Sequence, residues 1–397
     1  MYDIFLYKLE NKYSRMNIIF AINVPYPYGM AGSMRIRLFA EYLAKQSNDV
    51  QIIITNQDNG INSKEGSFNQ VLFGGVSTIA FSYYLYLTIY PFLVFLKLKL
   101  EKKKKDNNCL IIYGEPDIYT IPFIIFGKLL GYKVILDIVE DRFLTEEKLS
   151  IKANINLIFG KIISPLMIKA IDGIIVISKH LEKKYKTQSN LPLKLIPVSA
   201  VNLRETTDLY NSDNPFLKIV YSGSFGAKDG VDNLIDAFIQ ISQKNKRIKL
   251  ILIGSPKIEI QNKINEIENK YIEVTGYLPD DEYIRKLHDA DILCMTRIDS
   301  QYANAGFPFK LGEYLATGKP VVATDVSDIR LYLEDKKDVI LAKPSNIQSL
   351  VDALNYLIVC PEKREAIGVS GLKKCKKFFN PEINSKMLLD FVKNIHS

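Results

Sequence analysis

The sequence predicts an α/β protein built from two doubly wound domains, each with a parallel sheet. The chain has 397 residues, which is more than one hydrophobic core usually serves. Short apolar runs alternate with amphipathic helical stretches along its whole length, as expected for strands joined by crossover helices. A polar, turn-rich stretch at residues 202–215 separates two such series and marks the domain boundary.

Continuous apolar runs are typical of parallel strands that are buried on both faces. We therefore predict strands at 16–24, 50–55, 109–113, 133–139, 173–178, 193–198, 217–223, 248–254, 271–276, 292–297, 320–326 and 339–343. Helices are expected between them, for example over 231–243. The predicted domains cover 1–204 and 205–380, and a last helix over 381–397 packs back toward the first domain. Ligands of such sheets bind beyond the carboxyl ends of the strands, which predicts an active site between the two domains.

Composition narrows the class of protein. Four scattered cysteines without a CxxC spacing indicate buried thiols in a reducing cytosol, and three histidines argue against a histidine-based metal site. The net charge of +8 lies in residues 1–200, which hold about 25 Lys and Arg against about 17 Asp and Glu. No nucleic-acid motif accompanies this charge, so an anionic membrane surface is the favoured partner and nucleic acid is not.

Two segments support contact with a membrane. Residues 71–96 carry no charge and are long enough to span a bilayer, but tyrosines and Pro91 favour an internal or interfacial helix. Residues 155–170 form an amphipathic stretch with Lys161 and Lys169 on its polar side, suited either to lipid or to the sheet. The first fifteen residues lack the apolar core of a secretory signal. We expect a cytoplasmic protein, peripheral to the inner face of the plasma membrane.

The segment 306–324, GFPFKLGEYLATGKPVVAT, predicts a turn, a helix, a second turn and a strand. Pro308 suits the first helical turn and Gly318 suits the end of the helix. Lys310 and Glu313 lie three residues apart on one face. A helix N-terminus beside a lysine can bind phosphate, and a carboxylate one turn later can accept hydrogen bonds from a ribose. An ordinary strand–helix unit with a surface lysine and glutamate fits the same residues.

This segment resembles the nucleotide-sugar signature of retaining glycosyltransferase family 4, the glycosyl transferases group 1, in its FPxKLxEY form. The resemblance implies the GT-B architecture, two Rossmann-like domains facing across a cleft. It also implies that Glu313 binds the donor ribose. The loop expected to cap the donor diphosphate consists of Gly306, Phe307, Pro308 and Phe309.

A glycine turn follows the first predicted strand, in residues 26–44. Such a turn lets a ligand approach the backbone, and the helix start behind it favours phosphate. In the family this loop contacts the transferred sugar or the acceptor. The resemblance therefore implies donor contacts from Gly29 and Gly32 and acceptor contacts from Arg35 and Arg37.

A second glycine-rich loop, in residues 221–235, contains Lys228. The family usually places both an arginine and a lysine here, on the donor diphosphate. Lys228 matches the lysine, whereas Ser224 stands near the position of the arginine. We expect both residues to contact the donor, with Lys310, Arg297 or an arginine of the first domain supplying the missing charge. A glycine turn with a solvated lysine is the alternative.

Three carboxylates, Asp137, Glu140 and Asp141, close the predicted strand VILDIV. They resemble the family's Asp-x-His-Glu pattern, with Val139 in place of the histidine. Asp137 and Glu140 are expected to orient the acceptor hydroxyl or act as its base, and Asp141 to contact the acceptor. A helix cap or an ion-paired loop fits the same residues.

The resemblance adds Leu278, which would lie against the nucleotide base. It also exposes one departure, because many members carry a Glu-x7-Glu pair and Ala305 occupies the first position here. Asp299 or Asn304 is expected to supply the missing sugar contact.

The implied reaction moves a sugar from a nucleoside-diphosphate donor to a hydroxyl of a lipid-linked or polysaccharide acceptor. It retains the anomeric configuration and serves the synthesis of a capsule-like or O-antigen-like glycan. The expected catalytic residues are Asp137, Glu140, Lys228 and Lys310. No cofactor and no metal are expected, because fixed cations can stabilise the leaving diphosphate. A GT-B sugar-nucleotide epimerase and a non-catalytic GT-B partner subunit remain alternatives.

Overall fold

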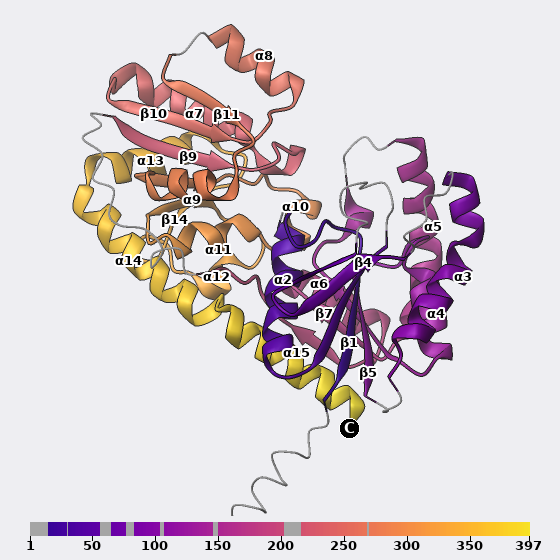
Figure 1. Ribbon diagram of the computed structural model, residues 1–397. Coiled ribbons are helices and arrows are strands. Elements are labelled where there is room, and N and C mark those ends of the chain that lie inside the picture. Colours follow the sequence, from indigo (N-terminus) through magenta and orange to yellow (C-terminus); the bar gives the residue numbers. More distant parts are fainter. Residues whose placement is uncertain are drawn as a thin grey trace, which may run out of the picture. The chain divides into compact units, whose positions relative to one another are not determined.

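A computed structural model describes residues 15–29, 31–55, 65–76, 83–103, 107–145, 150–201, 216–267 and 270–397 (Figure 1). These residues form two compact units. The first unit consists of the described residues up to Phe143, of 150–196 and of 384–397. The second unit consists of the described residues of 197–383 together with Leu144 and Thr145. The predicted linker at 202–215 lies outside the described residues. The chain changes unit between Ile196 and Pro197, a few residues before the predicted limit at 204.

The first unit contains an eight-stranded sheet in the order β3-β4-β2-β1-β5-β6-β7-β8. All neighbouring strands are parallel except β3 and β4. The strands are β1 (Asn17–Ile22), β2 (Asp49–Ile54), β3 (Gly66–Phe68), β4 (Val71–Gly75), β5 (Asn108–Tyr113), β6 (Lys133–Ile138), β7 (Gly173–Val176) and β8 (Leu193–Leu195). The helices are α2 (Ala31–Lys45), α3 (Tyr83–Glu101), α4 (Ile121–Leu129), α5 (Ile151–Ile168), α6 (Lys179–Gln188) and α15 (Pro381–His396).

The second unit contains a six-stranded parallel sheet in the order β11-β10-β9-β12-β13-β14. The strands are β9 (Leu217–Ser222), β10 (Ile248–Ile253), β11 (Ile272–Gly276), β12 (Ile292–Met295), β13 (Val321–Thr324) and β14 (Ile340–Ala342). The helices are α7 (Val231–Lys244), α8 (Ile258–Ile267), α9 (Asp280–His288), α10 (Gln301–Ala305), α11 (Phe309–Ala316), α12 (Ile329–Tyr332), α13 (Ile347–Val359) and α14 (Pro361–Phe378).

All twelve predicted strands are confirmed, with ends that shift by at most three residues. Their apolar runs are buried in the middle of each sheet, as in β1 and β5, where every residue is buried. The prediction missed β3 and β4. Residues 71–75, which were assigned to an uncharged helix, instead form β4 beside β2, and the helix α3 begins at Tyr83. Residues 77–82 of that segment lie outside the described part of the chain.

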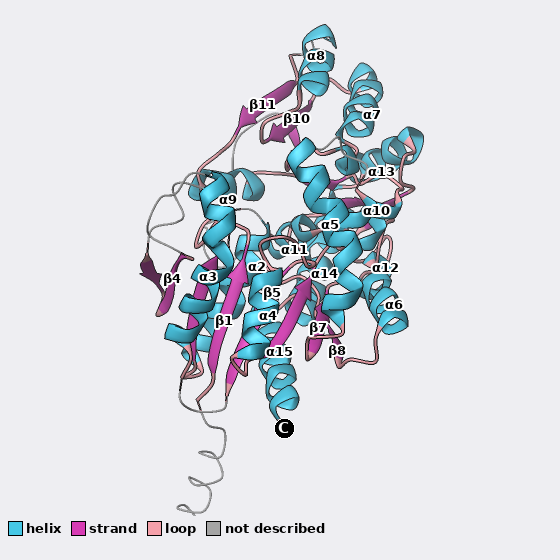
Figure 2. Cartoon of the chain, turned by 90° about the vertical axis from the view of Figure 1, so that its right-hand side faces the viewer, coloured by secondary structure: helices cyan, strands magenta, loops and turns pink. Residues whose placement is uncertain are grey.

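The helices of the first unit divide between the two faces of its sheet. The chain moves from β5 through β6 and β7 to β8 in one direction, so right-handed crossovers place α4, α5 and α6 on one face. Figures 1 and 2 show α3, α4 and α5 gathered along that side of the unit. The last helix, α15, belongs to this unit from Asn384 onward, and its Phe391 and Ile395 contact Gly173 of β7.

Among the described residues, no helix combines the length and the apolar character needed to cross a bilayer.

Candidate functional site

In each sheet the chain first adds strands on one side of the first strand and later continues on its other side. The loops at this switch point are the expected ligand site of a doubly wound domain. In the second unit the chain passes from β9 to β10 and β11 on one side and then returns to β12 on the other. The switch point therefore lies between β9 and β12. In the first unit the corresponding switch point lies between β1 and β5.

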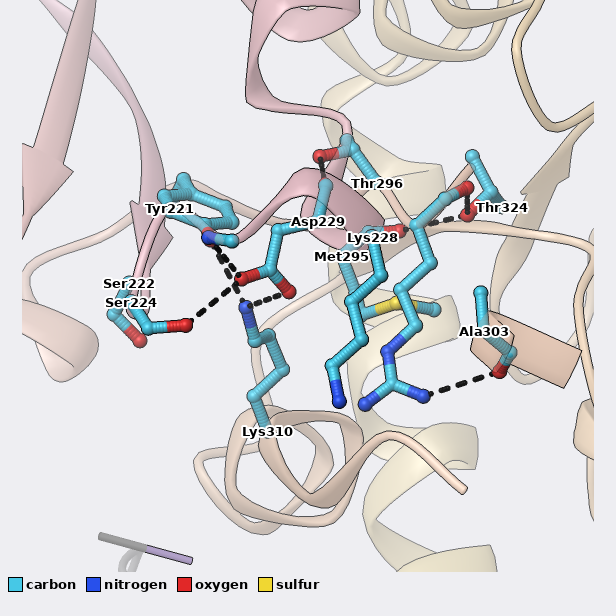
Figure 3. Close-up of polar contacts among 12 residues, drawn as sticks. Tyr221, Ser222, Ser224, Lys228, Asp229, Met295, Thr296, Ala303, Lys310 and Thr324 are labelled. Carbon is cyan, nitrogen blue, oxygen red and sulfur yellow. Dashed lines mark hydrogen bonds and ion pairs between the residues drawn. The ribbon is translucent and has the colours of Figure 1, made fainter. Parts of the chain in front are cut away.

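Lys310 and Asp229 form the centre of the candidate site in the second unit. The Lys310 ammonium lies 3.1 Å from Asp229 Oδ1 and 3.1 Å from the Tyr221 hydroxyl, and it sits 4.4 Å from the centre of the Tyr221 ring (Figure 3). Asp229 belongs to the turn after β9, whereas Lys310 lies in the first turn of α11. The fold thus joins two loops that are 81 residues apart in sequence.

Burial and neighbouring charges determine the electrostatics of this pair. Burial lowers the pKa of Lys310, and Asp229 acts against that shift. Burial alone would raise the pKa of Asp229, but Lys310 and Arg297 together hold it below its usual range. Asp229 is therefore an ionised carboxylate that compensates part of a buried positive cluster.

Two further cations lie near Asp229. Lys228 precedes it in the same turn and lies 4.4 Å from the centre of the Tyr302 ring, with its ammonium 3.5 Å from the Tyr302 hydroxyl. Arg297 follows β12, is buried, and donates to the carbonyl oxygen of Ala303 at 3.3 Å. Lys228, Arg297 and Lys310 carry three positive charges, and Asp229 carries one negative charge. The net charge of +2 is suited to an anionic ligand.

The glycine-rich loop is held in shape by Asp229 and by Gly230. Ser224 Oγ donates to Asp229 Oδ2 at 3.2 Å, and the backbone N–H of Gly226 donates to the same oxygen. Gly230 has a φ of +61°, and a Cβ atom there would lie 2.1 Å from the Thr296 carbonyl oxygen. Only glycine fits this position, and α7 begins at the next residue.

Glu313 lies one turn after Lys310 and belongs to a chain of hydroxyl groups. The Tyr283 hydroxyl donates to Glu313 Oε2 at 2.9 Å and lies 3.2 Å from Ser222 Oγ. The Tyr314 hydroxyl accepts from the Ser222 N–H at 2.8 Å. Burial raises the pKa of Glu313, although Tyr283 and Lys310 act against that shift. The position of this carboxyl group is therefore fixed by both α9 and α11.

In the loop predicted to cap the diphosphate, Phe307 directs its side chain into the core, and the capping role of the loop stays a prediction. The side chain of Phe307 is buried and packs against Tyr332 and Phe379, with ring centres 5.5 and 5.6 Å away, so it is part of the core. The Gly306 carbonyl accepts from the Ser327 hydroxyl. Pro308 precedes α11, and Phe309 is its first helical residue.

The structure also places the residues predicted to contact base and sugar. Leu278 is half-buried between β11 and α9. Asn304 donates to Asp299 Oδ1 at 2.9 Å and accepts from the Ser327 N–H at 2.9 Å, so its amide joins two loops. Ala305 is fully buried in this unit.

In the first unit, the structure corrects the roles expected of Arg35 and Asp137. The Arg35 guanidinium donates to both carboxylate oxygens of Asp137, at 2.9 and 3.0 Å, and also to the Ile196 carbonyl. The side chains are 0% and 1% exposed. A pair buried to this degree cannot contact an acceptor directly, because its hydrogen-bonding groups face each other. It ties α2 to β6 and positions the loops beside it.

Other predicted residues of the first unit stay near the surface. Arg37 is half-buried, lies 3.9 Å from Glu41 and approaches the ring of Tyr28. Glu140 is half-buried at the end of β6. A Cβ atom at Gly29 would lie 2.3 Å from Ser33 Oγ, and one at Gly32 would lie 2.6 Å from the Tyr113 hydroxyl oxygen, so the neighbouring side chain would have to shift in each case.

Asp141 belongs to a buried cluster that the sequence reasoning missed. Lys184 lies 2.8 Å from Asp141 Oδ2 and 2.8 Å from Glu115 Oε1. The Tyr185 hydroxyl donates to Glu115 at 2.6 Å. Burial raises the pKa of Glu115, and Lys184 acts against that shift. The cluster lies where β5, β6 and α6 converge.

Asp229 and Tyr283 are the other residues that sequence reasoning missed. Asp229 directly follows Lys228, and Tyr283 stands three residues after Asp280 on the first turn of α9. A carboxylate within a glycine-rich turn was the available signal for Asp229. The sequence offered no signal for Tyr283, since its partner Glu313 is 30 residues away.

Comparison with known proteins gives a family match in the second half of the chain. Residues 207–374 match the family model described as Glycosyl transferases group 1. An uncharacterized glycosyltransferase of Methanocaldococcus jannaschii is 29% identical over 209 residues, which cover 52% of this chain and 55% of that protein. The chain thus spans about half the length of this relative. These matches support the glycosyl transferases group 1 family.

Solved structures resemble the chain over nearly its full length. The sucrose-phosphate synthase of Thermosynechococcus elongatus superposes with a TM-score of 0.74 at 15% identity, covering 96% of this chain and 99% of that one. The HepE protein of Anabaena, in complex with UDP and glucose, gives a TM-score of 0.71 at 15% identity, covering 96% and 100%. The chain has the α/β GT-B fold with two Rossmann-like, parallel-sheet domains, which confirms the predicted fold class.

Proposed function

We propose that this protein is a glycosyltransferase that moves a sugar from a nucleoside-diphosphate sugar to an acceptor hydroxyl, with retention of the anomeric configuration. The observation that carries the proposal is the positive cluster of Lys228, Arg297 and Lys310 around Asp229. It lies at the switch point of the unit that contains the family match. The family match and this charge cluster, which lies inside the matched segment, both support an anionic nucleotide there.

The cluster suits the diphosphate of such a donor. Negative charge grows on the diphosphate as the bond to the sugar breaks, and fixed cations in a partly buried site stabilise that charge. Asp229 holds Lys310 in place within the protein. An incoming phosphate oxygen would share the Lys310 ammonium with Asp229, while Lys228 approaches from the turn after β9 that also holds Asp229. We therefore propose that transfer proceeds without a metal ion.

The nucleoside half is assigned to the neighbouring residues. Glu313 is proposed to accept hydrogen bonds from the ribose hydroxyls, since Tyr283 holds only one of its carboxylate oxygens. Leu278 is proposed to lie against the base. The Anabaena protein of the same fold binds UDP, and we therefore propose a uridine nucleotide as the first donor to test.

The acceptor is proposed to be lipid-linked or a polysaccharide, within cell-surface glycan synthesis. The positive charge of residues 1–200 supports an acceptor presented at an anionic membrane on the inner face of the plasma membrane. In the first unit, Arg37 and Glu140 are the predicted acceptor residues that keep exposed surface. The leaving phosphate is proposed to receive the proton of the acceptor hydroxyl.

The test combines binding and turnover. Thermal unfolding is followed with UDP, GDP, ADP and dTDP, because a ligand that binds only the folded protein raises the melting temperature. Isothermal titration then gives the affinity of the preferred nucleotide. We expect Lys228→Ala and Glu313→Ala each to weaken it by about tenfold or more, as for loss of a charged hydrogen bond. Transfer is assayed with the matching nucleotide sugars and membrane lipid extracts.

Lys337→Ala is the matched control, because Lys337 is exposed and pairs only with the exposed Glu334 among the contacts described. Its nucleotide affinity should equal that of the wild type. Binding without turnover on any donor would instead indicate a non-catalytic partner subunit. Unchanged affinity in both site variants would refute the assignment of the donor site.

A further inference from the structure

The helix α5 carries a continuous apolar stripe that faces solvent. Ile151, Ile155 and Ile162 are 81%, 64% and 74% exposed. Ile158, Phe159 and Leu166 are also exposed. At about 100° per residue, all six side chains fall within an arc of about 100° on one face of the helix. Their stripe extends over about 22 Å.

The opposite face of α5 is the one that packs on the protein. Ser164, Met167 and Ile168 are buried. A Cβ atom at Gly160 would lie 2.8 Å from the Pro116 carbonyl oxygen, so the helix backbone approaches that turn closely. Asn156 accepts a hydrogen bond from the Ile118 N–H at 3.1 Å. The helix α5 therefore packs on the first unit with one face, and the apolar stripe lies on its outer face.

The same layer of helices carries other exposed apolar side chains. Of the twenty large hydrophobic side chains that are exposed in the described residues, three lie on α3, two on α4, six on α5 and one on the turn before α4. These twelve form the majority, on one face of one sheet. Exposed apolar residues scattered singly need no explanation, but a concentration of this kind marks an interaction surface.

Charge indicates what covers this surface. The exposed Lys161 and Lys169 lie on α5 or at its end, and the helix contains no aspartate or glutamate. Lys99 is exposed on α3 beside Phe95. An apolar stripe bordered by lysines matches the boundary between acyl chains and anionic headgroups. A protein partner would have to supply both an apolar groove and acidic residues.

We propose that α5 lies in the interfacial layer of an anionic membrane, with its isoleucine stripe among the acyl chains and its lysines at the headgroups. The proposed function is needed only for the claim that the acceptor lies at this membrane. Binding to lipid follows from the surface itself and does not require sugar transfer.

The experiment measures flotation of the full-length protein with vesicles of phosphatidylcholine, with and without phosphatidylglycerol. We expect binding to the anionic vesicles that weakens with salt. Ile155→Gln with Ile162→Gln should lower the partition by about tenfold or more, because two exposed apolar side chains no longer enter the lipid. Lys161→Glu with Lys169→Glu should remove the preference for anionic lipid.

Ile258→Gln with Val359→Gln is the matched control, since both residues are equally exposed, at 72% and 71%, but belong to the second unit. It should float like the wild type. An unchanged melting temperature shows that each variant is folded.

The proposal is overturned if the wild type does not float, or if the α5 variant floats as well as the control. A wild-type dimer that the α5 variant abolishes, without lipid binding, would assign the surface to a second copy. Intact flotation of the wild type without any sugar transfer would count against the proposed function alone.

Discussion

Lys310 Nζ lies 3.1 Å from Asp229 Oδ1, and the two side chains are only 15% and 4% exposed. This contact joins the first turn of α11 to the turn after β9 at the switch point of the second sheet. It places a cation where the proposed diphosphate would lie, and it keeps the carboxylate of Asp229 ionised.

Removal of this cation should affect both stability and nucleotide binding. Lys310→Met leaves the buried Asp229 carboxylate without its nearest cation and should lower the free energy of unfolding by about 3 kcal/mol. Urea unfolding measures the change. Asp229→Asn in the same chain should restore much of the stability but not the nucleotide affinity. Equal recovery of both would show that Lys310 has only a structural role.

Glu313 should give nucleotide binding a pH dependence. Burial raises its pKa above the ordinary value of 4.5, so it protonates at a higher pH than an exposed glutamate. Only the carboxylate can accept two hydrogen bonds from a ribose, and affinity should therefore fall as the pH drops through the raised pKa. Isothermal titration at a series of pH values measures this. Glu313→Gln should bind weakly with no such dependence, and Tyr283→Phe should move the midpoint upward because it removes a donor to the carboxylate.

The Arg35–Asp137 pair should behave as a structural contact. Asp137→Ala leaves a buried guanidinium without its carboxylate and should cost about 3–5 kcal/mol in the free energy of unfolding. Arg35→Met with Asp137→Leu should recover most of that loss, since two apolar side chains leave no buried charge. Denaturant unfolding measures both. A stable Asp137→Ala protein that had lost only its turnover would return Asp137 to a direct catalytic role.

Lys184 should stabilise the first unit more strongly at neutral pH than in acid. It is the cation between Glu115 and Asp141, and burial already raises the pKa of Glu115. In Lys184→Met the carboxyl group of Glu115 favours its protonated form in the folded state, so the stability of the variant should fall as the pH rises through the raised pKa of Glu115. Urea midpoints at pH 5.5 and pH 8 give the comparison, with Lys186→Met, which lies in an exposed pair, as the control. Equal losses at both pH values would contradict this electrostatic role.

Gly230 should tolerate no side chain. Gly230→Ala brings a methyl group within 2.1 Å of the Thr296 carbonyl oxygen at a φ of +61°. Gly276→Ala is the control, with a φ of +72° and no atom within 4 Å of the added methyl group. The control should lose about 1 kcal/mol from backbone strain alone, and Gly230→Ala should lose clearly more and bind nucleotide weakly. Thermal unfolding and nucleotide titration separate the two effects.

The sequence by itself determined the strands, the class of fold and much of the donor segment. Buried parallel strands are continuous apolar runs, so twelve of them could be located from local pattern alone. The end of α11 before Gly318, with its φ of +74°, was equally local. The strand β4 lies in the same uncharged run as α3, so its residues were assigned to a helix, and only its pairing with β2 revealed the strand.

Only the tertiary structure decided which of the predicted residues meet. Arg35 and Asp137 lie 102 residues apart, and their pairing turned two expected ligand contacts into a buried link. Asp229 became the partner of Lys310, and Tyr283 the partner of Glu313, because parallel strands bring distant loops to the same edge of a sheet. The six apolar side chains of α5 fit a buried face or an exposed one equally well in sequence. Periodicity gives the face of a helix on which residues lie, whereas the packing of the whole unit decides whether that face meets the core or the solvent.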